Sequence, residues 1–162
     1  MPEVVSKIKA LALLSEEGNE HECLMCRINA NAAYILWEDE HCIVLLSEYP
    51  RFWGHIIVSA KQHVETFTEL PDETHTALFK NAYKAAKILE QLIKPARCYV
   101  ASVGSEQNLV NTCPHIHIHV IPVTGKSLKP SEVFTWEKGI FSGSKKEWST
   151  LCFSIKSMLP TV

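Results

Sequence analysis

Residues 113–122 constrain the fold of this chain most, because three histidines alternate there with isoleucine and valine. β-Branched apolar residues at alternate positions are typical of a β-strand, whose successive side chains point to opposite faces of the sheet. His115, His117 and His119 therefore share one face of the predicted strand, roughly 6–7 Å apart at a rise of about 3.3 Å per residue. We expect the apolar face to lie on a core and the histidine face to meet water, a metal or a substrate.

A purely structural role for these histidines is the alternative interpretation. Each imidazole could be satisfied by hydrogen bonds within a polar layer of the protein. A single histidine would favour that interpretation, but three on the same face of one strand favour a site. We therefore treat the histidine strand as the centre of a predicted functional site.

The composition of the chain excludes several classes of protein. With 162 residues, 46% of them hydrophobic and 21% charged, it is typical of a soluble globular protein with one sizeable core. A formal net charge of -2 gives no basic surface for bulk nucleic-acid binding. No apolar run approaches the roughly 20 residues of a membrane span, and the first residues do not resemble a signal peptide. Six cysteines without an export signal indicate a reducing compartment, so we expect a cytoplasmic protein.

The predicted elements indicate an antiparallel α+β fold. Runs of apolar and β-branched residues predict strands at 32–38, 42–47, 55–60, 97–103 and within 113–122. Apolar residues at helical spacing predict helices at 3–17, about 72–93 and 145–159. The expected apolar stripe of the long middle helix consists of Leu78, Tyr83, Ala86, Leu89 and Ile93. A meander of strands with one long helix inserted predicts an α+β domain with additional N- and C-terminal helices.

A metal site is the second functional prediction. Cys23 and Cys26 have the two-residue spacing that lets two thiolates bind one zinc ion. A redox dithiol and a pair of buried core cysteines are the rival interpretations. A closed tetrahedral site needs two further ligands, and His63 and His115 are the best candidates. The spacing alone leaves open whether these four side chains meet.

These motifs resemble those of the histidine triad (HIT) superfamily of nucleotide hydrolases and transferases. Residues 115–121, His-Ile-His-Ile-His-Val-Ile, are similar to the triad itself. Residues 23–28 resemble the Cys-x-x-Cys opening of zinc-bearing members, and residues 54–58 and 61–63 resemble the Gly-His strand and the histidine after it. The resemblance implies a single HIT-like domain over 1–162, with a core at about 23–123 and a C-terminal extension at about 124–162.

The resemblance also implies a role for each residue at a matching position. His117 would attack the α-phosphorus of a nucleotide, and His119 would contact the phosphate and help the leaving group depart. His55 would support the same polar network, and Thr112 would contact the phosphate. The implied zinc ligands are Cys23, Cys26, His63 and His115. The implied nucleotide-binding residues are Asn111, Ser47, Leu45, Ile57, Met25 and Ile28, of which the apolar ones are equally expected as core.

The function implied is attack on the α-phosphate of a nucleoside phosphoramidate or related nucleotide conjugate, through a covalent nucleotidyl-histidine intermediate. The resemblance also implies a homodimer and a structural zinc ion. A covalent intermediate divides one difficult displacement into two easier steps. A dinucleoside polyphosphate hydrolase or phosphorylase is the alternative enzyme. A nucleotide- or partner-binding module with little turnover is the alternative of another class. It stays open because Ser47 and Gly104 depart from the residues that members often carry there.

Overall fold

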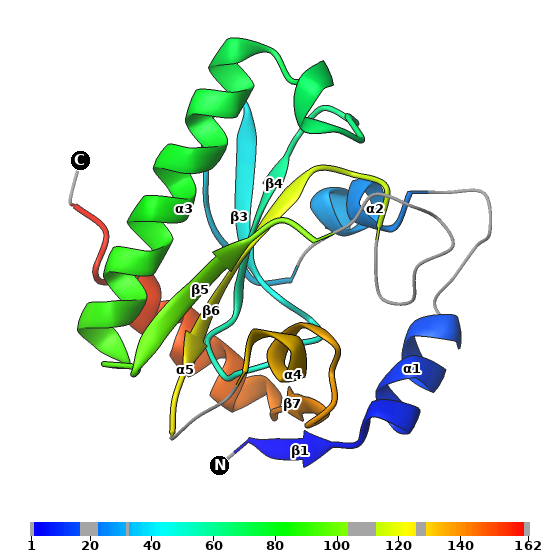
Figure 1. Cartoon of the computed structure of the whole chain (residues 1–162). Helices are drawn as coiled ribbons and strands as arrows, with labels where there is room; N and C mark the ends of the chain where they lie inside the picture. Colours follow the sequence, from blue (N-terminus) through cyan, green and yellow to red (C-terminus); the bar gives the residue numbers. More distant parts are fainter. Residues whose placement is uncertain (1, 17–22, 32, 104–112, 126–128, 161–162) are drawn as a thin grey trace.

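A five-stranded antiparallel sheet is the centre of the computed structural model, which describes residues 2–16, 23–31, 33–103, 113–125 and 129–160 (Figure 1). Its strand order is β2-β3-β4-β6-β5, and each neighbouring pair is antiparallel. The strands are β2 (Ile35–Glu38), β3 (Cys42–Leu46), β4 (Ile56–Ala60), β5 (Arg97–Ala101) and β6 (His117–Val123). The α+β class predicted from the sequence is thereby confirmed.

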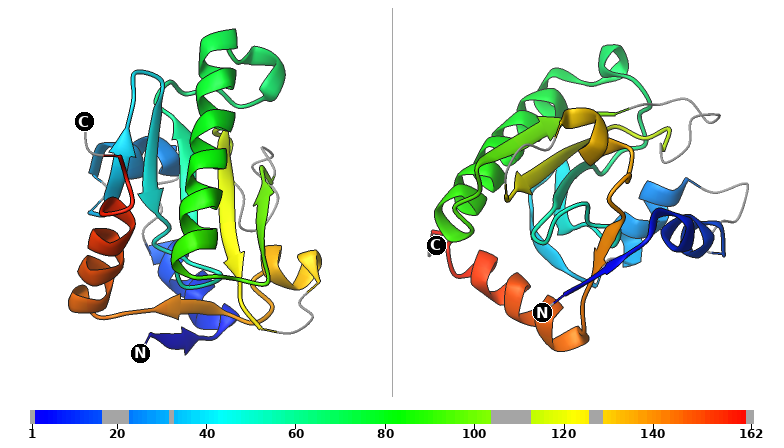
Figure 2. Two further views of the ribbon diagram at one scale, coloured as in Figure 1. Left: turned by 90° about the vertical axis from the view of Figure 1, so that its left-hand side faces the viewer. Right: turned by 60° about the horizontal axis from the view of Figure 1, so that its bottom comes forward.

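Helix α3 (Asp72–Leu92) covers one face of this sheet, and α5 (Lys145–Lys156) lies beside it on the same face (Figure 2). Leu78, Ala82, Ala85 and Leu89 recur every three or four positions and pack against the apolar face of β6, as expected for a buried helical stripe. The expected stripe was wrong at Tyr83, which is 71% exposed because it lies on the face of α3 that points away from the sheet.

The N-terminal segment differs from the predicted helix over 3–17. Strand β1 (Glu3–Val5) comes first and α1 (Lys7–Glu16) follows it. β1 pairs with β7 (Ile140–Ser142) in a separate two-stranded sheet. Valines at positions 4 and 5 fit either a helix or a strand by local pattern, and the distant β7 backbone decides between them. Strand β7, helix α4 (Pro130–Phe134) and the short 3-10 helix Phe67–Glu69 are elements that the sequence did not predict.

The second face of the sheet is covered by α2 (Leu24–Asn31), which lies on the opposite side from α3 (Figure 1). Met25 of α2 packs with Ile43, Leu45 and Ile57 of the sheet in a distinct apolar cluster. The histidine face of β6 belongs to this covered side, so it is buried and does not face open water. His115, His117 and His119 are 1%, 6% and 5% exposed. The strand is buried on both faces, which means that only specific polar partners can satisfy its imidazoles.

No helix in the described part of the chain is long and apolar enough to cross a membrane.

Candidate active site and metal centre

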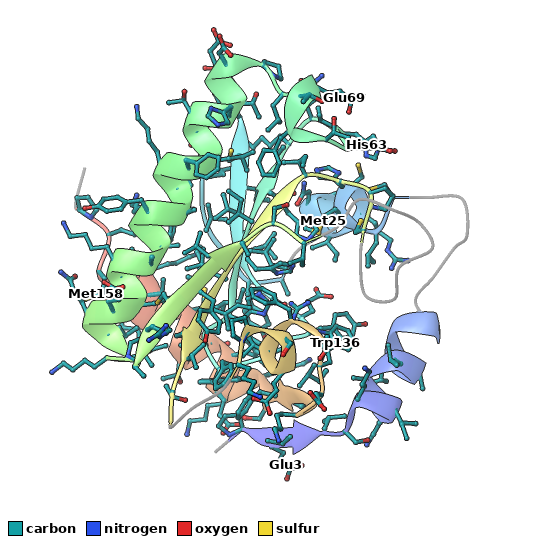
Figure 3. The ribbon with its side chains drawn as sticks, viewed as in Figure 1. Glu3, Met25, His63, Glu69, Trp136 and Met158 are labelled. Atoms are coloured by element: carbon teal, nitrogen blue, oxygen red, sulfur yellow. The ribbon has the colours of Figure 1, made fainter. Side chains whose placement is uncertain are left out.

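Cys23, Cys26, His63 and His115 come together from three parts of the chain. The thiols lie at the start of α2, His63 follows β4, and His115 lies two residues before β6. Figure 3 labels His63 and, on α2, Met25. One ligand atom from each of the four lies within 4.8 Å of all the others. The Sγ atoms of Cys23 and Cys26 are each 3.4 Å from Nδ1 of His115, and Cys26 Sγ is 3.5 Å from Nδ1 of His63.

The geometry of this cluster fits a zinc ion. Zinc with bonds of about 2.0–2.3 Å in a tetrahedron separates its ligand atoms by roughly 3.3–3.8 Å, which the three distances match. Nε2 of His115 donates to the carbonyl oxygen of Ala60 at 2.8 Å, so the lone pair of His115 lies at Nδ1, on the thiol side. Both thiols are only half-buried, which argues against core cysteines, and their imidazole neighbours favour metal binding over a redox pair.

Cys113 is a third thiol at this centre that the sequence did not single out. Its Sγ lies 3.9 Å from that of Cys23, yet Cys113 is outside the four-residue cluster. Burial raises the pKa of Cys113 to about 12, so it packs as a neutral thiol in the apolar cluster around Met25.

His117 has its tautomer fixed by its own strand. Its Nδ1 lies 2.6 Å from the carbonyl oxygen of His115, and because a carbonyl only accepts, Nδ1 carries the proton. The lone pair of the ring is therefore at Nε2. Burial lowers the pKa of His117, an effect that the hydrogen bond to the carbonyl opposes. A neutral imidazole with an anchored Nδ1–H and a free Nε2 lone pair is the state that a nucleophilic histidine requires.

His119 and His55 form a second, directional chain of hydrogen bonds. The backbone N–H of Arg51 donates to Nδ1 of His55 at 3.3 Å, so the proton of His55 is on Nε2. That Nε2–H donates to Nδ1 of His119 at 3.0 Å, and the Nη1 of Arg51 lies 3.4 Å from the same atom. The proton of His119 is therefore on Nε2. The rings of His117 and His119 are 4.8 Å apart and nearly perpendicular.

Burial controls the charges of this group. It lowers the pKa of His55 and of His119 well below the ordinary value, and the neighbouring Arg51 cation acts in the same direction. Burial also lowers the pKa of Arg51 to about 10, which leaves the guanidinium charged at neutral pH. The site thus combines neutral histidines with one buried cation.

The turn before β4 explains how these groups are positioned. Gly54 has φ +97, and a Cβ at this residue would lie 2.5 Å from Cδ1 of Ile93 at the end of α3. Only glycine combines that backbone conformation with so close an approach. The turn places His55 directly before β4 and brings the backbone N–H of Arg51 within 3.3 Å of its Nδ1. Sequence reasoning identified His55 but missed Arg51, because a single arginine between Pro50 and Phe52 carries no motif.

The residues predicted to bind the nucleotide have different outcomes. Met25, Leu45 and Ile57 are buried in one cluster with Ile28 packed against it, next to the metal centre. Ser47 follows β3 and is 3% exposed, and its backbone N–H donates to the carbonyl oxygen of His55 at 2.9 Å. Their burial is what core packing also requires, so nucleotide binding by these residues stays a prediction. Asn111 and Thr112 lie outside the described residues.

An antiparallel sheet with three alternating histidines on one strand, beside a cluster of two cysteines and two histidines, defines a histidine triad protein. The chain belongs to the HIT domain family, whose model matches residues 29–126, more than half of its length. It is 32% identical over 106 residues to an uncharacterized HIT-like protein of Methanocaldococcus jannaschii, which covers 62% of this chain and 78% of that protein. It is 29% identical over 122 residues to the nitrilase and fragile histidine triad fusion protein of Caenorhabditis elegans, covering 75% of this chain and 28% of the fusion protein.

Solved structures share the fold. A zinc-bound histidine triad family protein from Mycobacterium smegmatis superposes with a TM-score of 0.66 at 21% identity, over 86% of this chain and 97% of that one. A hypothetical histidine triad nucleotide-binding protein from Sulfolobus tokodaii superposes with a TM-score of 0.63 at 24% identity, over 83% and 90%. The resemblance inferred from the sequence motifs is thereby confirmed at the level of family and fold.

Proposed function

We propose that this protein cleaves nucleotide conjugates, in particular nucleoside phosphoramidates, at the α-phosphate through a covalent nucleotidyl-His117 intermediate. The observation that carries the proposal is the 2.6 Å hydrogen bond from Nδ1 of His117 to the carbonyl oxygen of His115. It leaves the Nε2 lone pair of a neutral imidazole for attack on phosphorus. Family membership supports nucleotide hydrolase or transferase chemistry in general.

The neighbouring groups match the needs of such a displacement. Negative charge on the phosphoryl oxygens is stabilised by preorganised donors in a site that excludes water. The Nε2–H of His119 is such a donor, because His55 and Arg51 both point their protons at its Nδ1. In the first step Nε2 of His117 bonds to the α-phosphorus, the P–N bond of the substrate breaks, and the amine leaves with a proton taken from solvent. In the second step water attacks the same phosphorus, the bond to His117 breaks, and the proton that water loses returns to solvent.

A zinc ion would be held by Cys23, Cys26, His63 and His115. Bound there, it supplies a rigid cross-link between α2, the end of β4 and the start of β6. The metal would then stiffen the backbone at His115, whose carbonyl oxygen orients His117. A homodimer and a cytoplasmic location complete the proposal, and sedimentation of the purified chain tests the first of these.

The test is a substrate panel with detection of the intermediate. Wild-type protein is mixed with adenosine and guanosine 5′-phosphoramidates and, separately, with dinucleoside polyphosphates. We expect faster cleavage of the phosphoramidates, and a transient mass increase of one nucleoside monophosphate residue that is absent from His117→Ala. Faster cleavage of the dinucleoside polyphosphates would favour the alternative enzyme. Nucleotide binding without turnover of either class would refute catalysis and favour a binding module.

A further inference from the structure

Arg51 is held in place by the chain that follows the matched family domain. Its guanidinium carbon lies 5.9 Å from the ring centre of Phe134 and 5.8 Å from that of Trp136. Both aromatic residues come after residue 126, where the HIT domain match ends. Phe134 also approaches His119, with ring centres 6.4 Å apart. The C-terminal extension therefore closes over the histidine network through Arg51.

The packing of Phe134 and Trp136 on Arg51 persists despite a strained backbone and buried polar atoms. Trp136 adopts φ 57, a left-handed conformation that costs a non-glycine residue free energy. Among the described residues, its buried Nε1 and the buried Nε of Arg51 each have no hydrogen-bond partner. Tyr49 stacks on Trp136, and Ala10 of α1 packs against it, so segments far from it in the sequence hold the tryptophan (Figure 3 labels it beside α4). Such strain persists where the surrounding structure imposes it, which is common at functional sites.

The described part of the chain offers the guanidinium of Arg51 no carboxylate counter-ion. Arg51 is 7% exposed, and no ion pair joins it to a carboxylate in the described part of the chain. Its polar side-chain partner is Nδ1 of the neutral His119. Arg51 lines a cavity of about 170 Å³ together with Glu132. The carboxylate of Glu132 is paired with Lys138, at 3.9 Å, and not with Arg51. A buried cation without a counter-ion is costly, and an anion that binds nearby would relieve that cost.

We propose that Arg51 is a positioning residue that supplies the fixed positive charge of the site, with the anionic α-phosphate of a bound nucleotide as its counter-ion, and that Phe134 and Trp136 hold it there. The α-phosphate identity rests on the proposed function. Arg51 acts through His119: the guanidinium polarises the ring from Nδ1, and the ring presents Nε2–H to the phosphate. The groups around His119 in the described structure are Arg51, His55 and His117, none of which is acidic.

The experiment compares a nucleotide with its uncharged nucleoside. Calorimetry measures the binding of AMP and adenosine, and of GMP and guanosine, to wild type and to Arg51→Met, which retains an apolar stem between the two aromatic rings. We expect Arg51→Met to weaken nucleotide binding by about 10- to 100-fold, the effect of losing one desolvated charge interaction. Nucleoside binding should stay within about twofold, because the phosphate is absent. Equal losses for both ligands, or no loss for the nucleotide, would overturn the proposal.

Three further variants keep the result interpretable. Arg51→Lys keeps the charge and should retain nucleotide affinity to within about fivefold, which decides the matter if Arg51→Met does not fold. A loss as large as that of Arg51→Met would show that charge is not what matters. Phe134→Leu should weaken nucleotide binding by about 3- to 10-fold, because the guanidinium of Arg51 is less constrained. Unchanged affinity would show that Phe134 does not hold Arg51 in place for binding. Arg97→Met, at an exposed arginine, is the matched control.

These measurements do not depend on turnover. An Arg51-dependent affinity for nucleotides in a protein that cleaves no conjugate would refute the catalytic proposal and support the inference about Arg51. Turnover with an affinity indifferent to Arg51 would do the reverse. The two proposals therefore fail in distinguishable ways.

Discussion

His117 illustrates how one backbone atom can determine the chemistry of a side chain. Along a strand, residues two apart share a face, so the carbonyl group of His115 lies within reach of the His117 ring. The 2.6 Å contact fixes the proton on Nδ1 and leaves Nε2 unprotonated. No other residue needs to move a proton for His117 to become a nucleophile. The same ring is 6% exposed, so its removal leaves a cavity as well as an inert site.

We expect His117→Ala to lower the rate of phosphoramidate cleavage by about 10³-fold or more, because no other group supplies the attacking nitrogen. Single-turnover kinetics on one substrate measure the change. His75→Ala, at an exposed histidine of α3, should cleave at the wild-type rate. A His117→Ala protein with nearly full rate would mean that water attacks directly and that the triad is scaffold. Added imidazole should partly restore the rate of His117→Gly, since the missing ring can be supplied in solution.

Helix α2 is held on the sheet by one apolar cluster, a few hydrogen bonds and the cysteine–histidine cluster. It is a short helix of 8 residues, and isolated helices of that length are unstable in water. Its contacts with the sheet are the apolar cluster around Met25 and the two thiols beside His115 and His63. Asn29 adds hydrogen bonds of 3.0 Å to Ser59 and to the carbonyl oxygen of Ala60. A zinc ion bound to these thiols and imidazoles would therefore fix α2 on the histidine side of the sheet.

We expect protein purified without added zinc to contain about one zinc per chain, and Cys26→Ser to lose it. Zinc at a hundred times its dissociation constant stabilises a folded site by about 2.7 kcal/mol. For a domain of this size, losing this stabilisation by zinc lowers the Tm by roughly 5–11 °C. Elemental analysis and thermal unfolding measure both effects. Cys152→Ser, distant from the centre, should retain zinc and Tm, and full zinc occupancy in Cys26→Ser would contradict the assignment.

The stability of the whole molecule should depend on pH because its buried histidines are neutral. His55 and His119 have folded-state pKa values well below the ordinary value, with burial as the main cause. Below about pH 6.5 the unfolded chain binds protons at these residues that the folded chain does not. The free energy of unfolding therefore falls as the pH falls below that value, by about 1.4 kcal/mol per pH unit for each imidazole.

Urea unfolding between pH 7.5 and 5.0, at constant zinc concentration, measures this dependence. We expect His55→Gln to reduce the slope of unfolding free energy against pH by about 1.4 kcal/mol per unit at the acidic end. His75→Ala removes an exposed histidine and should leave the slope unchanged. An identical slope in His55→Gln and wild type would mean that His55 is protonated in the folded protein.

The histidine strand and the cysteine pair were readable from the sequence because their geometry is local. Alternation along a strand places the triad on one face whatever the rest of the chain does. The two-residue spacing keeps Cys23 and Cys26 near each other, although helix α2, which follows Cys23 and carries Cys26, was not predicted. The long helix α3 and the strands of the central sheet were likewise predicted, since apolar periodicity over many residues resolves helix from strand.

Other features were decided only by contacts between distant parts of the chain. Valines in β1 became a strand because β7, more than a hundred residues away, offered its backbone. Arg51 joined the site because Trp136 and Phe134, far along the chain, cover it. The triad face is buried because α2 and α4 pack against it, whereas the sequence left open whether it meets water, a metal or a substrate. Local pattern fixes which way a side chain points along its own strand, but burial, charge and partners depend on packing that no local pattern encodes.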